Sequence, residues 1–310
     1  MEAMMEKLIY EGKDITRDAE VSIAVYETNA GNTDADSLRL EFATKEGWAY
    51  WQPKVGDCVE YRKDNATTGK MYIYDFDIDK TSTTLYASPM PPAASSGVTA
   101  SKTWESAYLS QIGSEIAGKH GMPFVLYNME DVPYDIKTQR KGQSDTAFLS
   151  DLARREGAAL IFYDGKILFA DEMKLEEAES VMDLQLNGAT YTSTDMDTTK
   201  FGSCIVKAGA ITGAFTADKN LPTLSIQADG VSSTAEASRM AKGELRNANK
   251  NISTITVTTE LIEALTAGVA VTLLGDVPAG WEGKLFAYRV RHEWHNNKTA
   301  ISLRRPLGGY

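Results

Sequence analysis

The chain has 310 residues, of which 43% are hydrophobic, 24% charged and 9% aromatic, the composition of a soluble globular protein. This length suffices for two or three packed cores, so a mini-protein held together by disulfides is excluded. No run of 18 apolar residues and no signal-peptide profile occurs, so we expect neither a membrane segment nor a leader. Cys58 and Cys204 lie far apart in the sequence, and we expect both to be free thiols.

The net charge of −11 is unevenly distributed along the chain. Residues 1–95 carry 10 basic and 17 acidic side chains (net −7), residues 96–185 carry 9 and 15 (net −6), and residues 186–310 carry 13 and 11 (net +2). Binding to a phosphate backbone requires clustered lysine and arginine. Specific nucleic-acid binding is therefore not expected, whereas repulsion of a nucleic acid is compatible with the acidic first two thirds.

Residues 1–95 have the pattern of a small all-β domain. Short segments that alternate apolar with polar residues are separated by turn signals, which favours a small barrel or a sandwich. The predicted strands are 7–10, 21–26, 38–42, 55–61, 69–78 and 83–87. Three prolines among small residues at 88–97 are typical of a stiff connector, so we place a domain boundary there.

The middle segment, residues 96–185, combines helix and strand patterns, so we expect an α+β domain. Apolar residues recur at three- and four-residue steps over 101–120 and again over 144–156, and a glycine follows each stretch. These spacings predict two helices. Residues 158–170, with an Asp-Gly turn near the centre, predict a β-hairpin.

Residues 186–310 return to strand patterns, interrupted by one long helix. A Ser-Thr-Ala-Glu capping box at 233–236 and the apolar face after it predict that helix. Strands are expected at 191–194, 203–207, 223–227, 252–258, 269–274, 284–291 and 299–304. We therefore predict a mixed β and α+β fold, in which two β-barrel-like domains (1–95 and 186–310) flank an inserted α+β domain (96–185).

The two β-rich ends share a sequence pattern. Gly-Asp-Cys-Val at 56–59 precedes Gly-Lys-Met-Tyr-Ile-Tyr-Asp-Phe at 69–76, and Gly-Val-Ala-Val at 268–271 precedes Gly-Lys-Leu-Phe-Ala-Tyr-Arg-Val at 283–290. Two interpretations of this shared pattern are open. Any two hairpins with glycine turns can look alike, and alternatively the chain contains a duplicated β-domain. Three duplicated chains in a ring would present six similar β-domains to a sixfold partner.

With these features in this order, the chain resembles the baseplate hub proteins of contractile tails, the late control protein D and valine-glycine-repeat hub group. The resemblance covers almost the whole chain but includes no catalytic or metal-binding motif. It rests on the opening hairpin at 10–16, the helix and strand at 143–166, the Ala-x-x-x-Ala-x-x-x-Leu helix at 237–250 and the closing pattern at 267–292.

The resemblance implies a structural protein. Such a hub is a homotrimer whose two β-barrel tube domains per chain form a pseudo-hexameric ring, and it joins the tail tube to the central spike beside other baseplate proteins. It belongs to the baseplate of a phage tail or a tail-like particle (a tailocin or related injection system), assembled in the bacterial cytoplasm. Because the chain ends at Tyr310, we expect no fused spike or lysozyme-like domain, and a separate spike protein would be required.

The sequence indicates no enzyme, and we assign no catalytic, cofactor-binding or metal-binding residue. His292 and His295 are three residues apart, so on a strand they would point to opposite faces, and nucleophile and phosphate-loop motifs are missing. The acidic residues within 171–179 could supply paired carboxylates for glycoside hydrolysis, but we expect them to form a solvated helix face. The alternative functions are a tail-associated cell-wall-degrading enzyme and a carbohydrate-binding module.

Asp75, Asp77 and Asp79 are candidates for an acidic channel stripe. They alternate with apolar residues, so on a strand their carboxylates would share one face. No EF-hand glycine or glutamate follows them, so calcium is not expected. Facing a channel, the stripe would repel a passing polyanion.

Trp48, Tyr50 and Trp51 are candidates for an interface. Tryptophan and tyrosine are typical of interface hot spots. The same cluster also suits the packed core at the mouth of a barrel, or a platform on which a sugar stacks.

Overall fold

The computed structural model describes residues 6–31, 35–42, 52–97, 101–163, 165–187, 189–195 and 199–310. Strands from both ends of the chain form one 14-stranded sheet, beside three smaller sheets. Among the described residues, no helix is long and apolar enough to cross a membrane. Both cysteines are free thiols, as expected.

The first β unit comes from the N-terminal segment. Its strands alternate buried with partly exposed side chains, most regularly in β4, because one face of the sheet packs on a core that includes Leu40, Ile73 and Leu85. Across the sheet the order is β3 (Val21–Asn29), β4 (Ser37–Phe42), β8 (Thr83–Ser88), β7 (Met71–Ile78) and β5 (Cys58–Lys63), and the strands β1 (Glu6–Tyr10), β2 (Lys13–Asp14) and β6 (Ala66–Thr67) adjoin β5 or β1.

The second β unit comes mainly from the C-terminal segment and has its own core, which includes Val257, Val271 and Ile301. Its strands lie in the order β15 (Thr190–Asp195), β19 (Ser253–Glu260), β22 (Lys298–Arg304), β21 (Gly283–Glu293) and β20 (Val269–Leu274), with β14 (Ser180–Gln185) parallel to β20 and the short η3 (Trp294–Asn296) between β21 and β22.

The two units have the same strand order and the same register. Val59 lies opposite Met71 in the β5·β7 pair, and Val271 lies opposite Leu285 in the β20·β21 pair, which are the positions that the sequence pattern aligns. The β7·β8 and β4·β8 registers likewise match those of β21·β22 and β19·β22. The sequence repeat is therefore also a structural repeat, in which β3, β4, β5, β7 and β8 correspond to β15, β19, β20, β21 and β22.

Shared irregularities support this correspondence. The β7·β8 register shifts at Tyr74, and the β21·β22 register shifts at Tyr288, the tyrosine at the same repeat position. Such bulges bend and twist a strand locally. Gly56 and Gly268 precede β5 and β20 with φ of 96° and 91°, a conformation in which a Cβ atom would be strained.

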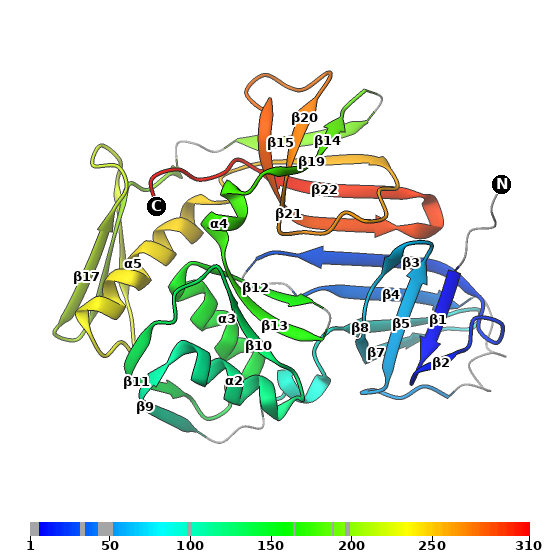
Figure 1. The fold of residues 1–310 in the computed structure, drawn as a ribbon, viewed down its shortest axis with the longest axis horizontal. Coiled ribbons are helices and arrows are strands. Elements are labelled where there is room, and N and C mark those ends of the chain that lie inside the picture. Colours follow the sequence, from blue (N-terminus) through cyan, green and yellow to red (C-terminus); the bar gives the residue numbers. More distant parts are fainter. Residues whose placement is uncertain are drawn as a thin grey trace.

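Strand β21 joins the two units. Its first half pairs with β20, and its second half, from Arg289 to Glu293, pairs with β3 between Asn29 and Val25. The strands follow one another from β15 at the top to β7 at the lower right in Figure 1. The predicted mixed β and α+β fold is confirmed, and no closed barrel is found in the described part of the chain.

The middle segment is α+β, with helices packed against short strands around Phe148, Leu152 and Phe169. The predicted helix over 144–156 and the predicted hairpin over 158–170 are confirmed. The elements are η1 (Pro92–Ser95), β9 (Lys102–Tyr108), α2 (Leu109–Lys119), β10 (Phe124–Tyr127), β11 (Pro133–Gln139), α3 (Asp145–Glu156), β12 (Ala158–Tyr163), β13 (Lys166–Asp171) and α4 (Glu172–Glu177).

The prediction of one helix over 101–120 is wrong in its first half. Residues 102–108 form β9, which pairs with β11. Trp104 and Ala107 are both buried although they are three residues apart, whereas a regular strand alternates faces. Ser106 between them has a φ of 51°, which interrupts the alternation and produces a spacing that resembles a helical one.

A small helix-and-sheet unit completes the C-terminal segment; its helix and the strands near 203–207 and 223–227 were predicted, whereas the strand at 211–216 was not. Helix α5 (Thr234–Asn249) begins where the Ser233 Oγ accepts a hydrogen bond from the backbone N–H of Glu236, as an N-cap does. Ala237 and Leu245 pack it against β16 (Ser203–Ala208), β17 (Ile211–Thr216) and β18 (Thr223–Gln227). The division at residues 95 and 185 stays a prediction.

Candidate assembly interface

Within the described part of the chain, strand β15 is open on one edge and on both faces. All six of its residues are exposed, and β19 is its one strand partner in the described part of the chain. In β3, the corresponding strand of the first unit, Val25 and Tyr26 are buried at 7% and 8% exposure. Because β15 has the backbone of a sheet strand without this cover, it is a candidate binding edge.

The second half of β7 is another open edge within the described part of the chain. Beyond Ile73, whose backbone bonds to Gly56 and Asp57, β7 pairs with β8 alone among the described residues. Ile78 is 59% exposed, whereas His292 at the same repeat position in β21 is 1% exposed. His292 stacks on Tyr26 of β3 at 6.4 Å between ring centroids, so the buried state of that position depends on a neighbouring strand.

The three aspartates of the predicted acidic stripe are all exposed, but they do not all lie on a strand. Asp75 and Asp77 belong to β7, whereas Asp79 follows it in a turn. The Asp79 carboxylate accepts hydrogen bonds from the backbone N–H groups of Ser82 (2.7 Å) and Thr81 (2.6 Å). These bonds lower the pKa of Asp79 to about 2, and the carboxylate is engaged within its own turn.

The corresponding positions of the second unit carry the opposite charge. In the shared register, Asp75 corresponds to Arg289 and Asp77 to Arg291. The first unit therefore carries an acidic row at the positions where the second unit carries a basic row. The aromatic candidates Trp48, Tyr50 and Trp51 lie outside the described residues, so their role stays a prediction.

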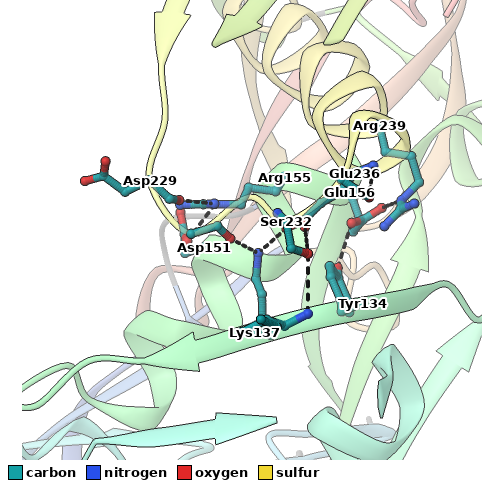
Figure 2. A network of polar contacts seen from close by, with 12 residues as sticks. Tyr134, Lys137, Asp151, Arg155, Glu156, Asp229, Ser232, Glu236 and Arg239 are labelled. Carbon is teal, nitrogen blue, oxygen red and sulfur yellow. Dashed lines mark hydrogen bonds and ion pairs between the residues drawn. The ribbon is translucent and has the colours of Figure 1, made fainter. Parts of the chain in front are cut away.

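A network of polar contacts connects the middle segment to α5 and to the loop before it, as Figure 2 shows. The Lys137 Nζ of β11 donates to the Glu236 Oε1 of α5 at 2.7 Å, and both side chains are buried. The other carboxylate oxygen of Glu236 accepts the backbone N–H of Ser232 at 2.9 Å. Burial lowers the pKa of Lys137 against the raising influence of Glu236.

The same network includes the end of α3. Glu156 accepts a hydrogen bond from the Tyr134 Oη at 2.6 Å and pairs with the Arg239 Nε of α5 at 2.8 Å. Arg155 pairs with Asp151 at 2.8 Å one helical turn earlier. Buried ion pairs contribute little net stability but require a defined geometry. The network therefore orients α5 relative to β11 and α3.

The prediction that residues 171–179 form a solvated helix face is wrong for two of them. Glu172 and Glu176 are each 1% exposed. Glu172 pairs with Arg304 of β22 at 2.9 Å and with Arg246 of α5 at 3.0 Å. These cations follow Glu172 by 132 and 74 residues, so no local pattern indicates them.

This buried cluster also shifts the pKa of Glu172. Burial alone would raise that pKa, but Arg304, Lys250 and Arg246 outweigh burial and lower it to about 2. Lys250 contributes an ion pair to Glu172 at 3.1 Å. The carboxylate is held ionised by its partners, so the cluster is a structural junction between α4, α5 and β22.

The histidines are engaged in hydrogen bonds. The two ring nitrogens of His292 contact the Thr299 Oγ1 (3.0 Å) and the Leu265 carbonyl oxygen (2.8 Å). His120 is the C-cap residue of α2, and its Nε2 lies 2.9 Å from Asp145. No group of three or more potential metal ligands occurs among the described residues.

Asp36 is a buried carboxylate that sequence patterns do not indicate. Burial raises its pKa to about 7, although a hydrogen bond from the backbone N–H of Asn29 (2.8 Å) opposes the shift. Asp36 lines a cavity of about 150 Å³ with Tyr26, Tyr163 and Ala267. It is the one carboxylate among the described residues that line this cavity, whereas glycoside hydrolysis generally requires two.

The fold is similar to solved structures of phage tail proteins. The 43 kDa tail protein of prophage MuSo2 from Shewanella oneidensis has a TM-score of 0.73 at 14% identity, over 98% of this chain and 99% of that chain. The tail protein from Neisseria meningitidis MC58 has a TM-score of 0.74 at 14% identity, over 97% and 96% of the chains. No protein-family model and no curated protein matches the sequence.

The likeness extends to a secretion system. The Escherichia coli c3393 protein, described as a type VI secretion component with structural similarity to the T4 tail proteins gp27 and gp5, has a TM-score of 0.61 at 14% identity. The match covers 98% of this chain and 78% of that chain. Together these likenesses establish that the whole chain has a tail-protein fold.

Proposed function

We propose that this chain is a structural baseplate hub of a contractile phage tail or tail-like particle. Three chains form a pseudo-sixfold ring that joins the tail tube to the central spike and contacts other baseplate proteins. The chain acts without catalysis or a cofactor, in particles assembled in the bacterial cytoplasm. The repeat of two β units in one register carries the proposal, because three chains then contribute six similar units.

The similar solved structures support this proposal at the level of the fold. Two of them are described as tail proteins, and a third as a secretion component related to tail proteins. The similarity spans nearly the entire chain in each case, so both β units and the middle segment are included. A tail-associated enzyme lacks comparable support, because the buried carboxylates Glu156 and Glu172 are neutralised by arginine and lysine partners.

An acidic channel stripe at Asp75, Asp77 and Asp79 is part of this proposal. In a ring of six units, acidic rows from the first unit would alternate with the Arg289 and Arg291 rows of the second. Neutralising the three aspartates to asparagine should then change the ejection of DNA in a DNA-carrying particle. Unchanged ejection would contradict a role of the stripe in repelling the polyanion.

Light scattering over a concentration series tests the ring directly. We expect a mass of about 102 kDa, three times the 33.9 kDa of one chain, for the protein alone or with its spike protein added. Negative-stain images of particles produced without this chain should show tubes that lack the spike. A chain that stays monomeric with its spike present would overturn the proposed ring.

A further inference from the structure

Inside one chain, the two β units already bind each other by strand pairing. In the contact between β21 and β3, Arg291 lies opposite Glu27 and His292 opposite Tyr26. The contact buries His292 and Tyr26 to 1% and 8% exposure. The matched registers make β7 the counterpart of β21 and β15 the counterpart of β3. Each unit thus has one edge like that of β21 and one like that of β3, and within the described part of the chain only β21 and β3 pair with each other.

We propose that the two remaining edges pair with each other between copies, β7 of one copy antiparallel to β15 of the next. This inference rests on the proposed function, because it identifies the contact that closes the ring. Transfer of the internal register places Asp77 opposite Thr194 and Ile78 opposite Ser193. Backbone hydrogen bonds would supply the affinity, as in other cases of strand addition.

The exposed apolar side chains at these edges fit the pairing. Ile78 is 59% exposed and Tyr191 is 48% exposed. When Ile78 lies opposite Ser193, Tyr191 of the next copy is its diagonal neighbour, a separation that an aromatic side chain can span. The contact would then cover both side chains, as the internal contact covers His292 and Tyr26.

Charge favours head-to-tail pairing over a symmetric dimer. If β7 paired with β7 of another copy, Asp75 and Asp77 of one strand would lie beside the same aspartates of the other, which is destabilising. In head-to-tail pairing, Asp77 faces the neutral Thr194. The acidic segment of one chain (net −7 over 1–95) also adjoins the weakly basic segment of the next (net +2 over 186–310).

Head-to-tail contacts close into a ring when the rotation per unit is suitable. A ring of three chains would contain six equivalent strand contacts, three within chains and three between them. The inter-chain contact therefore repeats a geometry that the chain already adopts.

Disulfide trapping tests the register. In a Cys58→Ser/Cys204→Ala background, the pair Ile78→Cys and Ser193→Cys should form covalent dimers and trimers under mild oxidation on a non-reducing gel. The control pair Ile78→Cys and Thr194→Cys is shifted by one residue and places the thiols on opposite faces. We expect its cross-linked fraction to be lower by on the order of tenfold.

A charge at the edge provides an independent test. Ile78→Lys should raise the concentration at which half of the chain is associated by on the order of tenfold or more. Val181→Lys is the control, because Val181 is also exposed (60%) but lies on β14. Both variants should keep the unfolding midpoint of the parent chain.

The outcomes distinguish this contact from the ring itself. A trimer that neither forms the 78–193 cross-link nor responds to Ile78→Lys would overturn the strand pairing and leave the ring proposal standing. Equal cross-linking of the 78–193 and 78–194 pairs would overturn the register. A chain that stays monomeric with its spike would overturn both proposals.

Discussion

Among single residues, Glu172 is a tightly held carboxylate, because Arg304, Arg246 and Lys250 all pair with it. Glu172→Gln would remove one of the two carboxylates that pair with Arg304 and Arg246, and would break the ion pair to Lys250. We expect the free energy of unfolding to fall by about 3–5 kcal/mol in urea titrations. As a control, Glu260→Gln removes the exposed ion pair with Lys298 and should change the free energy of unfolding by less than about 1 kcal/mol. Equal small losses would show that the buried cluster adds no stability.

The same carboxylate predicts acid sensitivity. Its folded-state pKa of about 2 lies below the usual 4.5, so its contribution to stability is complete above pH 4.5 and is lost as the pH falls toward 2. Urea titrations between pH 5 and pH 2 should therefore show a steeper loss of stability for the parent chain than for Glu172→Gln. Parallel curves would contradict the assignment.

Asp36 has the opposite pH dependence. Burial raises its folded-state pKa from 3.8 to about 7, so the stability that it contributes is present below pH 3.8 and is lost as the pH rises through 7. Between pH 4 and pH 7, Asp36→Asn should become progressively more stable relative to the parent chain, and above pH 7 this stability difference should stay constant. Melting midpoints of both chains at pH 4, 6 and 8 would measure the difference. The same difference at all three pH values would contradict the raised pKa of Asp36.

Among the elements, α5 and α3 approach closely at a glycine. A Cβ atom at Gly243 would lie 2.6 Å from the Arg155 carbonyl oxygen and 2.7 Å from that of Arg154. Gly243→Ala should therefore separate the helices and lower the free energy of unfolding by about 1–3 kcal/mol in urea titrations.

Gly118 in α2 is the matched control, because a Cβ atom there has no neighbour within 4 Å. Gly118→Ala should raise stability by about 0.5–1 kcal/mol, since alanine is the better helix former. If both substitutions had the same effect, the close approach at Gly243 would not constrain the packing of α5.

At the scale of the whole molecule, the shared sheet should couple the two β units. Val290 of β21 is fully buried and lies opposite Thr28 of β3. Val290→Ala should lower the unfolding free energy by about 2 kcal/mol. We expect the amides of β4 and β19 to lose hydrogen-exchange protection together in rising urea. Two separate transitions would show that the units unfold independently.

The elements that depend on local patterns were predicted well. Helix α3 and helix α5 have their caps at Ser144 and Ser233, and strands such as β4, β5 and β22 alternate in burial. The helix predicted over 101–120 was half wrong because Ser106 at positive φ breaks the alternation of β9. Local spacing cannot distinguish that break from a helical period.

The sequence by itself determined the position of most strands and helices and the repeat of the two β units, because periodicity, caps and glycine turns act over a few residues. Only the tertiary structure decided that β21 pairs with β3, that β7 and β15 have open edges among the described residues, and that Glu172 and Glu176 are buried. Each of these depends on partners that are distant in the chain. Burial and charge neutralisation are set by such partners, and no local pattern encodes them.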